Sequence, residues 1–100
     1  MRTNVAAIFD IGKTNRKFFL VDEHYHIVHE RSETGVEVSD EDGFPCEDLV
    51  TLQAFIRSGM EEAAAMTAYR VKAVNVSAYG ASFVHVDDSG KPVTPLYNYL

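Results

Sequence analysis

A short polar segment near the start of the 100-residue sequence carries side chains that could bind a nucleotide phosphate and its metal ion. Asp10 could hold a divalent cation, because such cations prefer carboxylate oxygens and retain several waters. Gly12 lets the backbone approach an anion closely. The candidate phosphate-binding residues are Gly12, Lys13, Thr14, Asn15 and Lys17. Together with Asp10 they fit a triphosphate with its Mg²⁺.

Two other interpretations fit parts of this segment. Gly12-Lys13-Thr14 matches the end of a P-loop, but that motif requires glycine where the chain has Ala7, and a helix where it has a strand-like run. The P-loop is therefore rejected. The segment could also be an ordinary turn, in which Asp10 and Asn15 are turn formers and Gly12 supplies a positive φ. The segment alone leaves that alternative open.

Apolar runs on both sides predict that the polar segment is the turn of a β-hairpin. Residues 5–9 form a continuous apolar run of the kind buried on both faces, and residues 18–21 are aromatic and branched. The predicted strands cover about residues 4–9 and 17–22. A third strand is predicted at 25–31, so the three would form an antiparallel meander.

The middle of the chain predicts a loop and one long helix. Residues 32–45 are rich in acids, serine and glycine, which indicates a solvated loop with a short edge strand at 36–38. A helix is predicted at about 47–68, with Glu47 and Asp48 in its first turn. Its core-facing residues are Leu49, Leu52, Phe55, Ile56, Met60, Ala63 and Ala64. Residues 71–77 begin a further strand, which the intervening helix makes parallel to an earlier one.

A second segment with chemical content follows that strand. Tyr79-Gly80 interrupts the strand pattern where an aromatic ring and a bare backbone could meet a ligand, and residues 88–91 are typical of a hairpin turn. The segment by itself is also compatible with the end of a buried strand.

Both segments resemble the FGGY carbohydrate kinases of the actin-like, ribonuclease-H-like ATPase superfamily. Asp10, Gly12 and Thr14 resemble the first phosphate motif, D-x-G-T-[TS], with Lys13 in place of the first hydroxyl residue. Residues 79–83 are similar to the W-G-V-D-F segment of rhamnulokinases and the F-G-V-D segment of fuculokinases, with Ser82 in place of aspartate. Residues 87–92 resemble the hairpin that follows in that family.

The resemblance implies an α/β fold of the ribonuclease-H-like half-domain type: a mixed sheet with an antiparallel three-strand start, one main helix, a parallel strand and a hairpin. It implies ATP and Mg²⁺ as cofactors, with Asp10 holding the metal shell. A sugar of the ketose or deoxy-ketose class would bind at Tyr79, Gly80 and Ser82. The general base is expected downstream, so this chain is interpreted as the N-terminal piece of a longer kinase, and a homodimer is left open.

Composition excludes other classes of function. The net charge of −6 and pI near 5.0 argue against nucleic acid or anionic membrane as partners, although Lys13, Arg16 and Lys17 could form a local basic patch. The single cysteine, Cys46, excludes an internal disulfide, and the histidines at 24, 26 and 29 lack partner ligands nearby in the sequence. Without a signal peptide or membrane-length apolar run, the expected location is the cytoplasm.

Two further hypotheses remain beside the kinase. One is an actin-like module that binds nucleotide, or only partners, and has an assembly or regulatory role without sugar kinase activity. The other is a helix-on-sheet domain without a ligand. Residues 79–92, which resemble the sugar-contacting segment and hairpin of the kinases, weigh against the first hypothesis. Failure of the full-length protein to bind MgATP would favour the second.

Overall fold

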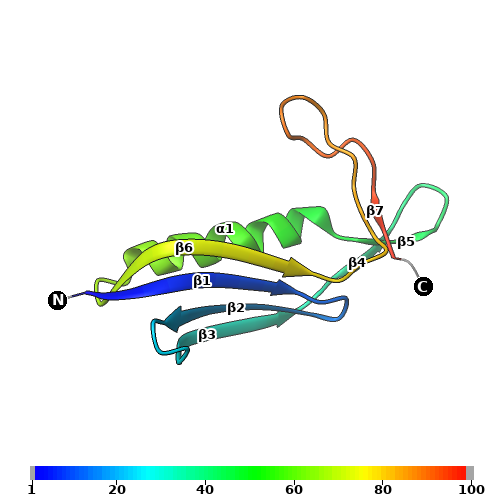
Figure 1. The fold of residues 1–100 in the computed structure, drawn as a ribbon. Helices are drawn as coiled ribbons and strands as arrows, with labels where there is room; N and C mark the ends of the chain where they lie inside the picture. Colours follow the sequence, from blue (N-terminus) through cyan, green and yellow to red (C-terminus); the bar gives the residue numbers. More distant parts are fainter. Residues whose placement is uncertain (1, 99–100) are drawn as a thin grey trace.

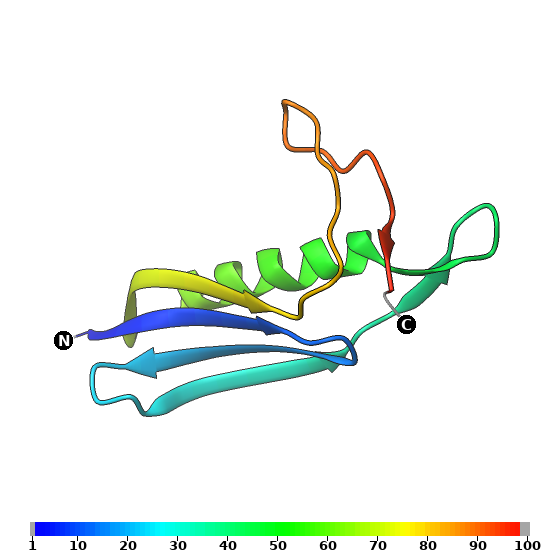
Figure 2. The same cartoon turned by 45° about the vertical axis from the view of Figure 1, so that its right-hand side comes forward.

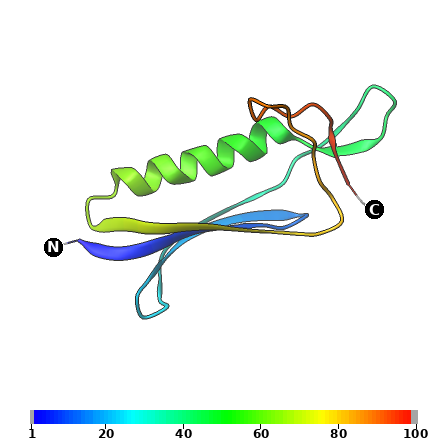
Figure 3. The same ribbon diagram turned by 45° about the horizontal axis from the view of Figure 1, so that its top comes forward.

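A computed structural model describes residues 2–98 as a four-stranded sheet with one helix on one face and a small second sheet at one end (Figure 1). The four strands of the main sheet are β1 (Thr3–Ile11), β2 (Asn15–Asp22), β3 (Ile27–Thr34) and β6 (Tyr69–Ala78). The helix is α1 (Leu49–Ala65), and the small sheet contains β4 (Glu37–Ser39), β5 (Pro45–Glu47) and β7 (Leu96–Tyr97). Figure 3 shows α1 lying along one side of the main sheet.

The main sheet has the order β3-β2-β1-β6. β2 pairs antiparallel with both β1 and β3, whereas β6 pairs parallel with β1. The parallel pairing follows from α1, because a helical crossover returns the chain in its original direction. The predicted fold class, a mixed α/β sheet with an antiparallel start, one helix and a parallel strand, is confirmed.

The core lies between the sheet and α1. Phe9, Phe18 and Phe55 are at most 1% exposed, and the Phe9 and Phe18 rings stack with centroids 4.8 Å apart. Burial in β1 alternates: Ala6 and Ile8 are only half-buried. In the described part of the chain, residues 2–98, the expectation that residues 5–9 are buried on both faces is therefore wrong. These two side chains point away from α1, where the described part of the chain places no second layer.

Several strand boundaries differ from their predicted positions. β2 begins at Asn15 rather than residue 17, because the hairpin turn is tighter than expected. β3 begins at Ile27 rather than residue 25, because Asp22 organises a turn by accepting the backbone N–H groups of His24 and His26. Tyr25 adopts a left-handed φ of 65° within that turn, and β3 then continues to Thr34 rather than ending at residue 31.

The helix is shorter at both ends than the predicted range of 47–68. Asp48 caps it by accepting the Val50 N–H, and Glu47 belongs to β5 rather than to the first helical turn. The helix ends at Ala65, where Met66 adopts an extended conformation. Most of the predicted stripe faces the sheet, but Ala64 is exposed. Within residues 2–98 no helix combines the length and apolarity that crossing a bilayer requires.

The small sheet and a projecting hairpin occupy the end of the molecule near the C-terminal end of β1. The predicted edge strand exists as β4, one residue later than expected, and β5 and β7 were not predicted. The hairpin rises away from the main sheet in Figure 2. Its turn is confirmed: Asp87 accepts the N–H groups of Ser89 and Lys91, and Gly90 has a φ of +81°.

Gly59 is the point of closest approach between α1 and the sheet, and Gly59→Ala is expected to destabilise the protein. A Cβ there would lie 2.8 Å from Phe9 Cε1 and 3.3 Å from Phe18 Cγ. Overpacking costs about 1–3 kcal/mol and exceeds the roughly 1 kcal/mol gained in helix propensity. Denaturant unfolding should show a net loss, whereas Gly80→Ala, whose Cβ would meet no atom within 4 Å, should show none. Equal effects of both variants would contradict this account.

Candidate functional site

The two segments singled out in the sequence meet at one edge of the main sheet. β1 and β6 are parallel and end together, with Asp10 paired with Ser77 and Ile11 with Ala78. The Tyr79 N–H then donates to the Ile11 carbonyl oxygen at 3.0 Å. The predicted phosphate hairpin (residues 10–17) and the sugar-like segment (residues 79–83, similar to the kinases' sugar-contacting segment) are therefore adjacent. They lie at the carboxyl ends of parallel strands, the usual position of ligand sites in open α/β sheets.

The hairpin turn is built around Gly12. The Gly12 N–H donates to the Asn15 carbonyl oxygen at 2.9 Å, and a Cβ on Gly12 would lie 2.9 Å from that same oxygen. Gly12 does not adopt a positive φ, so the turn requires glycine for lack of space rather than for backbone freedom. Its own amide is occupied within the turn.

Asp10 and Lys17 occupy the open face of the sheet beside that turn. They are directly paired across β1 and β2, both side chains are exposed, and Ser77 completes the row on β6. Residues 2–98 contain no group of three or more acidic, histidine or cysteine side chains that could hold a metal ion. Asp10 is a fitting ligand for Mg²⁺, because this ion commonly takes one or two carboxylates and completes its shell with water and phosphate oxygens.

A cavity of about 290 Å³ lies at the tip of the hairpin. Its lining includes two predicted phosphate-binding residues, Lys13 and Thr14. The remaining lining residues are Thr34, Gly35, Val36, Glu37, Glu47 and Asn98. Thr14 and Asn15 are exposed, and Lys13 is half-buried. The cavity places a lysine, a hydroxyl and turn backbone, groups that suit an anionic ligand, around one space that the carboxylates of Glu37 and Glu47 also line.

Arg16 does not belong to a surface basic patch, and the expectation that it joins Lys13 and Lys17 there is wrong. Its side chain is fully buried, and Nη2 lies 2.8 Å from Glu47 Oε1. The alternation of β2 explains this position, because Arg16 shares the core-facing side with Phe18 and Leu20. A side chain usually found on the surface is thus enclosed beneath the hairpin.

The sugar-like segment leaves β6 in a strained conformation. Ala81 has a φ of 68°, which is uncommon for a residue other than glycine and often marks a functional site. Ser82 donates its hydroxyl to the Tyr97 carbonyl oxygen at 2.9 Å, which ties the segment to β7. Tyr79 is half-buried, and Gly80 is exposed.

A second cavity, of about 360 Å³, lies beside this segment. Of the three predicted sugar-binding residues, only Ser82 lines it. Its other lining residues are Ala81, Phe83, His85, Thr94, Pro95, Tyr97 and Asn98. Asn98 lines both this cavity and the one at the hairpin, and Nδ2 donates to Glu37 Oε1 at 2.6 Å. No sequence motif singled out Asn98, because only the β5–β7 pairing brings it here.

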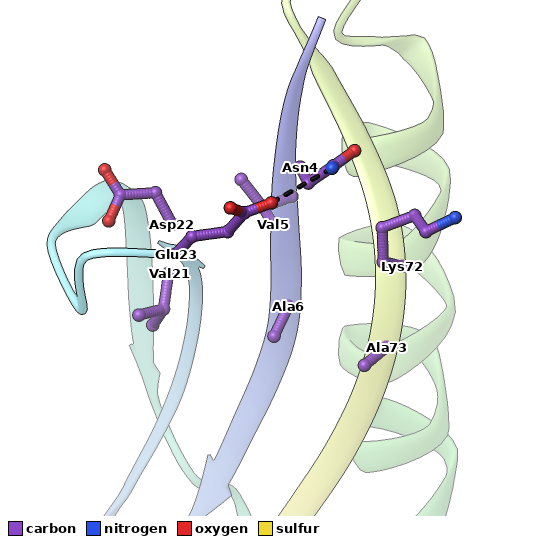
Figure 4. A pocket seen from close by; sticks show the side chains of 8 residues that line it. All are labelled: Asn4, Val5, Ala6, Val21, Asp22, Glu23, Lys72 and Ala73. Atoms are coloured by element: carbon purple, nitrogen blue, oxygen red, sulfur yellow. Dashed lines mark hydrogen bonds between the residues drawn. The ribbon is translucent and has the colours of Figure 1, made fainter.

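A separate hollow of about 320 Å³ lies at the other end of β1 (Figure 4). It lies on the face of the sheet away from α1 and is floored by Ala6, Val21 and Ala73, which share one register row. Asn4 donates to Glu23 Oε1 at 3.0 Å across its rim. The hollow is remote from both signature segments, so it is not included in the candidate site.

Tyr97 is expected to titrate unusually late. Its hydroxyl donates to Asp40 Oδ2 at 2.8 Å, and this bond raises the pKa of Tyr97 to about 12 and lowers the pKa of Asp40. The stabilising contribution of the neutral phenol is complete below the ordinary pKa near 10 and is lost as pH rises toward 12. An ultraviolet phenolate titration should lose a step near pH 12 in Tyr97→Phe, and the Asp40 pKa should rise. An unchanged titration would contradict the assignment.

The fold matches solved carbohydrate kinases. A carbohydrate kinase from Novosphingobium aromaticivorans aligns with a TM-score of 0.86 at 17% identity, covering 99% of this chain and 20% of that protein. Plasmodium falciparum glycerol kinase, solved with ADP, aligns with a TM-score of 0.79 at 20% identity, covering 96% and 20%. Xylulose kinase from Rhodospirillum rubrum gives 0.74 at 23%, covering 93% and 20%. No protein-family model matches the sequence, and no curated protein matches it significantly.

These matches define the class of fold. The chain has the same mixed α/β fold as the part of these solved carbohydrate kinases that it matches. It spans about one fifth of the length of the solved kinases that it matches. At this level of identity the likeness establishes the fold, and activity is a separate question.

Proposed function

We propose that this chain is the N-terminal domain segment of an ATP-dependent carbohydrate kinase that phosphorylates a sugar hydroxyl. The observation that carries the proposal is the adjacency of the two signature segments, through the parallel β1–β6 pairing and the bond from Tyr79 to Ile11. A phosphoryl donor and an acceptor must approach within bonding distance for in-line transfer. The two segments proposed to hold them lie at the same edge of the sheet.

Each group has an assigned role in this proposal. Asp10 would hold the Mg²⁺ shell, and the hairpin residues Gly12, Lys13, Thr14, Asn15 and Lys17 would contact the phosphates. Lys13 or Lys17 would offset charge developing on the transferred phosphoryl oxygens. Tyr79, Gly80 and Ser82 would line the sugar site. Ser82 would accept a hydrogen bond from a sugar hydroxyl while its own hydroxyl continues to donate to the Tyr97 carbonyl oxygen. The general base would come from a downstream part of the protein.

The substrate would be a ketose or deoxy-ketose, and the location would be the cytoplasm. The alternative is a regulatory actin-like module that binds nucleotide without transferring phosphate. The strained Ala81 and the cavity beside Ser82 favour the kinase, because a module without a sugar substrate has no need of either.

The experiment is ATP consumption by the full-length protein over a panel of ketoses, deoxy-ketoses and polyols, with Asp10→Ala as the control. Turnover on one sugar that collapses in the variant would support the kinase and identify its substrate. MgATP binding without turnover on any sugar would favour the regulatory module.

A further inference from the structure

A buried ion pair lies directly beneath the proposed phosphate hairpin. Arg16 is the second residue of β2, and its side chain has no exposed surface. Nη2 donates to Glu47 Oε1 at 2.8 Å, and Nη1 donates to Thr51 Oγ1 at 3.2 Å. Nη1 also lies 3.4 Å from Glu33 Oε2, a carboxylate that is 45% exposed and therefore solvated. Glu47 is only 4% exposed, so little water reaches its carboxylate, and the Arg16 guanidinium compensates its charge.

The Glu47 carboxylate faces the hairpin cavity. Glu47 lines that cavity together with Lys13 and Thr14. A Cβ on Gly35 would lie 3.1 Å from Glu47 Oε1 and 3.4 Å from the Thr14 carbonyl oxygen, so these two groups flank the same narrow space. The Gly35 N–H donates to that Thr14 oxygen at 2.7 Å. A negative charge on Glu47 is therefore placed next to the loop proposed to bind phosphate.

We propose that Arg16 is a positioning residue that sets the charge beneath the phosphate hairpin. Its guanidinium neutralises Glu47, so that this carboxylate does not add to the negative charge that Glu37 already places on the cavity wall where MgATP would bind. This inference rests on the proposed nucleotide role of the hairpin. Arg16 itself is enclosed and acts through Glu47.

The two members of the pair therefore have opposite effects on anion binding. Removing Arg16 leaves the Glu47 carboxylate at the cavity wall without this guanidinium, and its negative charge then repels the phosphates. Removing the charge of Glu47 leaves a guanidinium there, which attracts them. Interactions between charges are strong where water is excluded, so one uncompensated charge is expected to change affinity by about tenfold. A pair with only a structural role would weaken binding in both variants.

The test measures MgATP affinity by calorimetry on the full-length protein. Arg16→Met is expected to weaken binding by about tenfold, and Glu47→Gln to bind at least as tightly as wild type. The double variant Arg16→Met/Glu47→Gln restores neutrality and should return to within about twofold of wild type. Weakening by similar factors in both single variants, or a double variant as weak as Arg16→Met, would overturn the proposal.

One single variant and one control variant allow the affinity measurements to decide for or against the role of Arg16. Glu47→Gln decides the question alone if Arg16→Met does not fold, because the glutamine amide oxygen can still accept the hydrogen bond from Arg16. Arg31→Met is the matched control: it breaks the Arg31–Glu62 pair, 3.2 Å long, between β3 and α1, and should leave MgATP affinity unchanged. An equal loss in this control would overturn the local charge effect.

Failure of the proposed kinase activity gives a different result. Wild-type protein that binds MgATP but phosphorylates no sugar refutes the transferase alone, and the affinities of the variants still test Arg16. Wild-type protein that does not bind MgATP refutes the role of Arg16 as well.

Discussion

Asp10→Ala in the full-length protein is expected to reduce the rate of phosphoryl transfer by about 10²–10³-fold or more, the usual loss when one preorganised electrostatic contact is removed. The reason is the loss of the carboxylate proposed to hold the Mg²⁺ shell, which positions the phosphates and neutralises their developing charge. Asp10→Asn should lose nearly as much, because it keeps the shape and removes the charge. Steady-state kinetics with the cognate sugar measures both.

The fold should be unaffected by these changes. Asp10 is exposed and lies outside the core cluster, so its replacement is expected to alter the free energy of unfolding by no more than about 0.5 kcal/mol. Asp42→Ala, which removes another exposed acid in the loop between β4 and β5, should retain full activity. Retention of more than about a third of the wild-type rate by Asp10→Ala, a loss of well under 1 kcal/mol in activation free energy, would refute the metal role.

Phe55→Ala is expected to lower the free energy of unfolding by about 3–5 kcal/mol, the usual cost of truncating a buried phenylalanine. Phe55 is 1% exposed, and its ring packs edge-on against Phe9 with centroids 6.3 Å apart. The Arg31 guanidinium lies over the ring, 5.2 Å from its centroid. Removal therefore opens a cavity between the helix and the sheet and also removes a cation–π contact.

Phe44→Ala is the matched control for Phe55→Ala. Phe44 is 59% exposed and precedes β5, so its truncation should change stability by no more than about 0.5 kcal/mol. Denaturant unfolding of both variants provides the comparison. Similar losses from the two variants would contradict the placement of the core between α1 and β1.

Gly12 illustrates how a glycine that the sequence singles out can have a structural cause that residue types do not reveal. Its importance followed from the sequence, where glycine in a polar turn suggests either a close approach to a ligand or a positive φ. In the structure φ does not explain it, because Gly12 has no positive φ and the Asn15 carbonyl oxygen already occupies the place of a Cβ. Contacts of this kind depend on the conformation of the turn, which residue types alone do not specify.

Local patterns determined the main elements of this protein. Apolar alternation, the spacing of the helical stripe and the turn residues are properties of neighbouring residues, and they predicted the β1–β2 hairpin, α1 and the parallel β6. The chirality of crossover connections then restricted the topology. The predicted phosphate hairpin and sugar-like segment therefore come together as strand ends in the same sheet.

Tertiary structure alone decided how the site is enclosed. β5 and β7 contain three and two residues, too few for a periodic signal, and their pairing joins parts of the chain that are about fifty positions apart. That pairing brings Asn98 to both cavities. The burial of Arg16 was detectable in the alternation with Phe18 and Leu20, but its partner was not, because Glu47 lies 31 positions away. A charged side chain can be buried only when the fold supplies the opposite charge, and only the completed structure shows that partner.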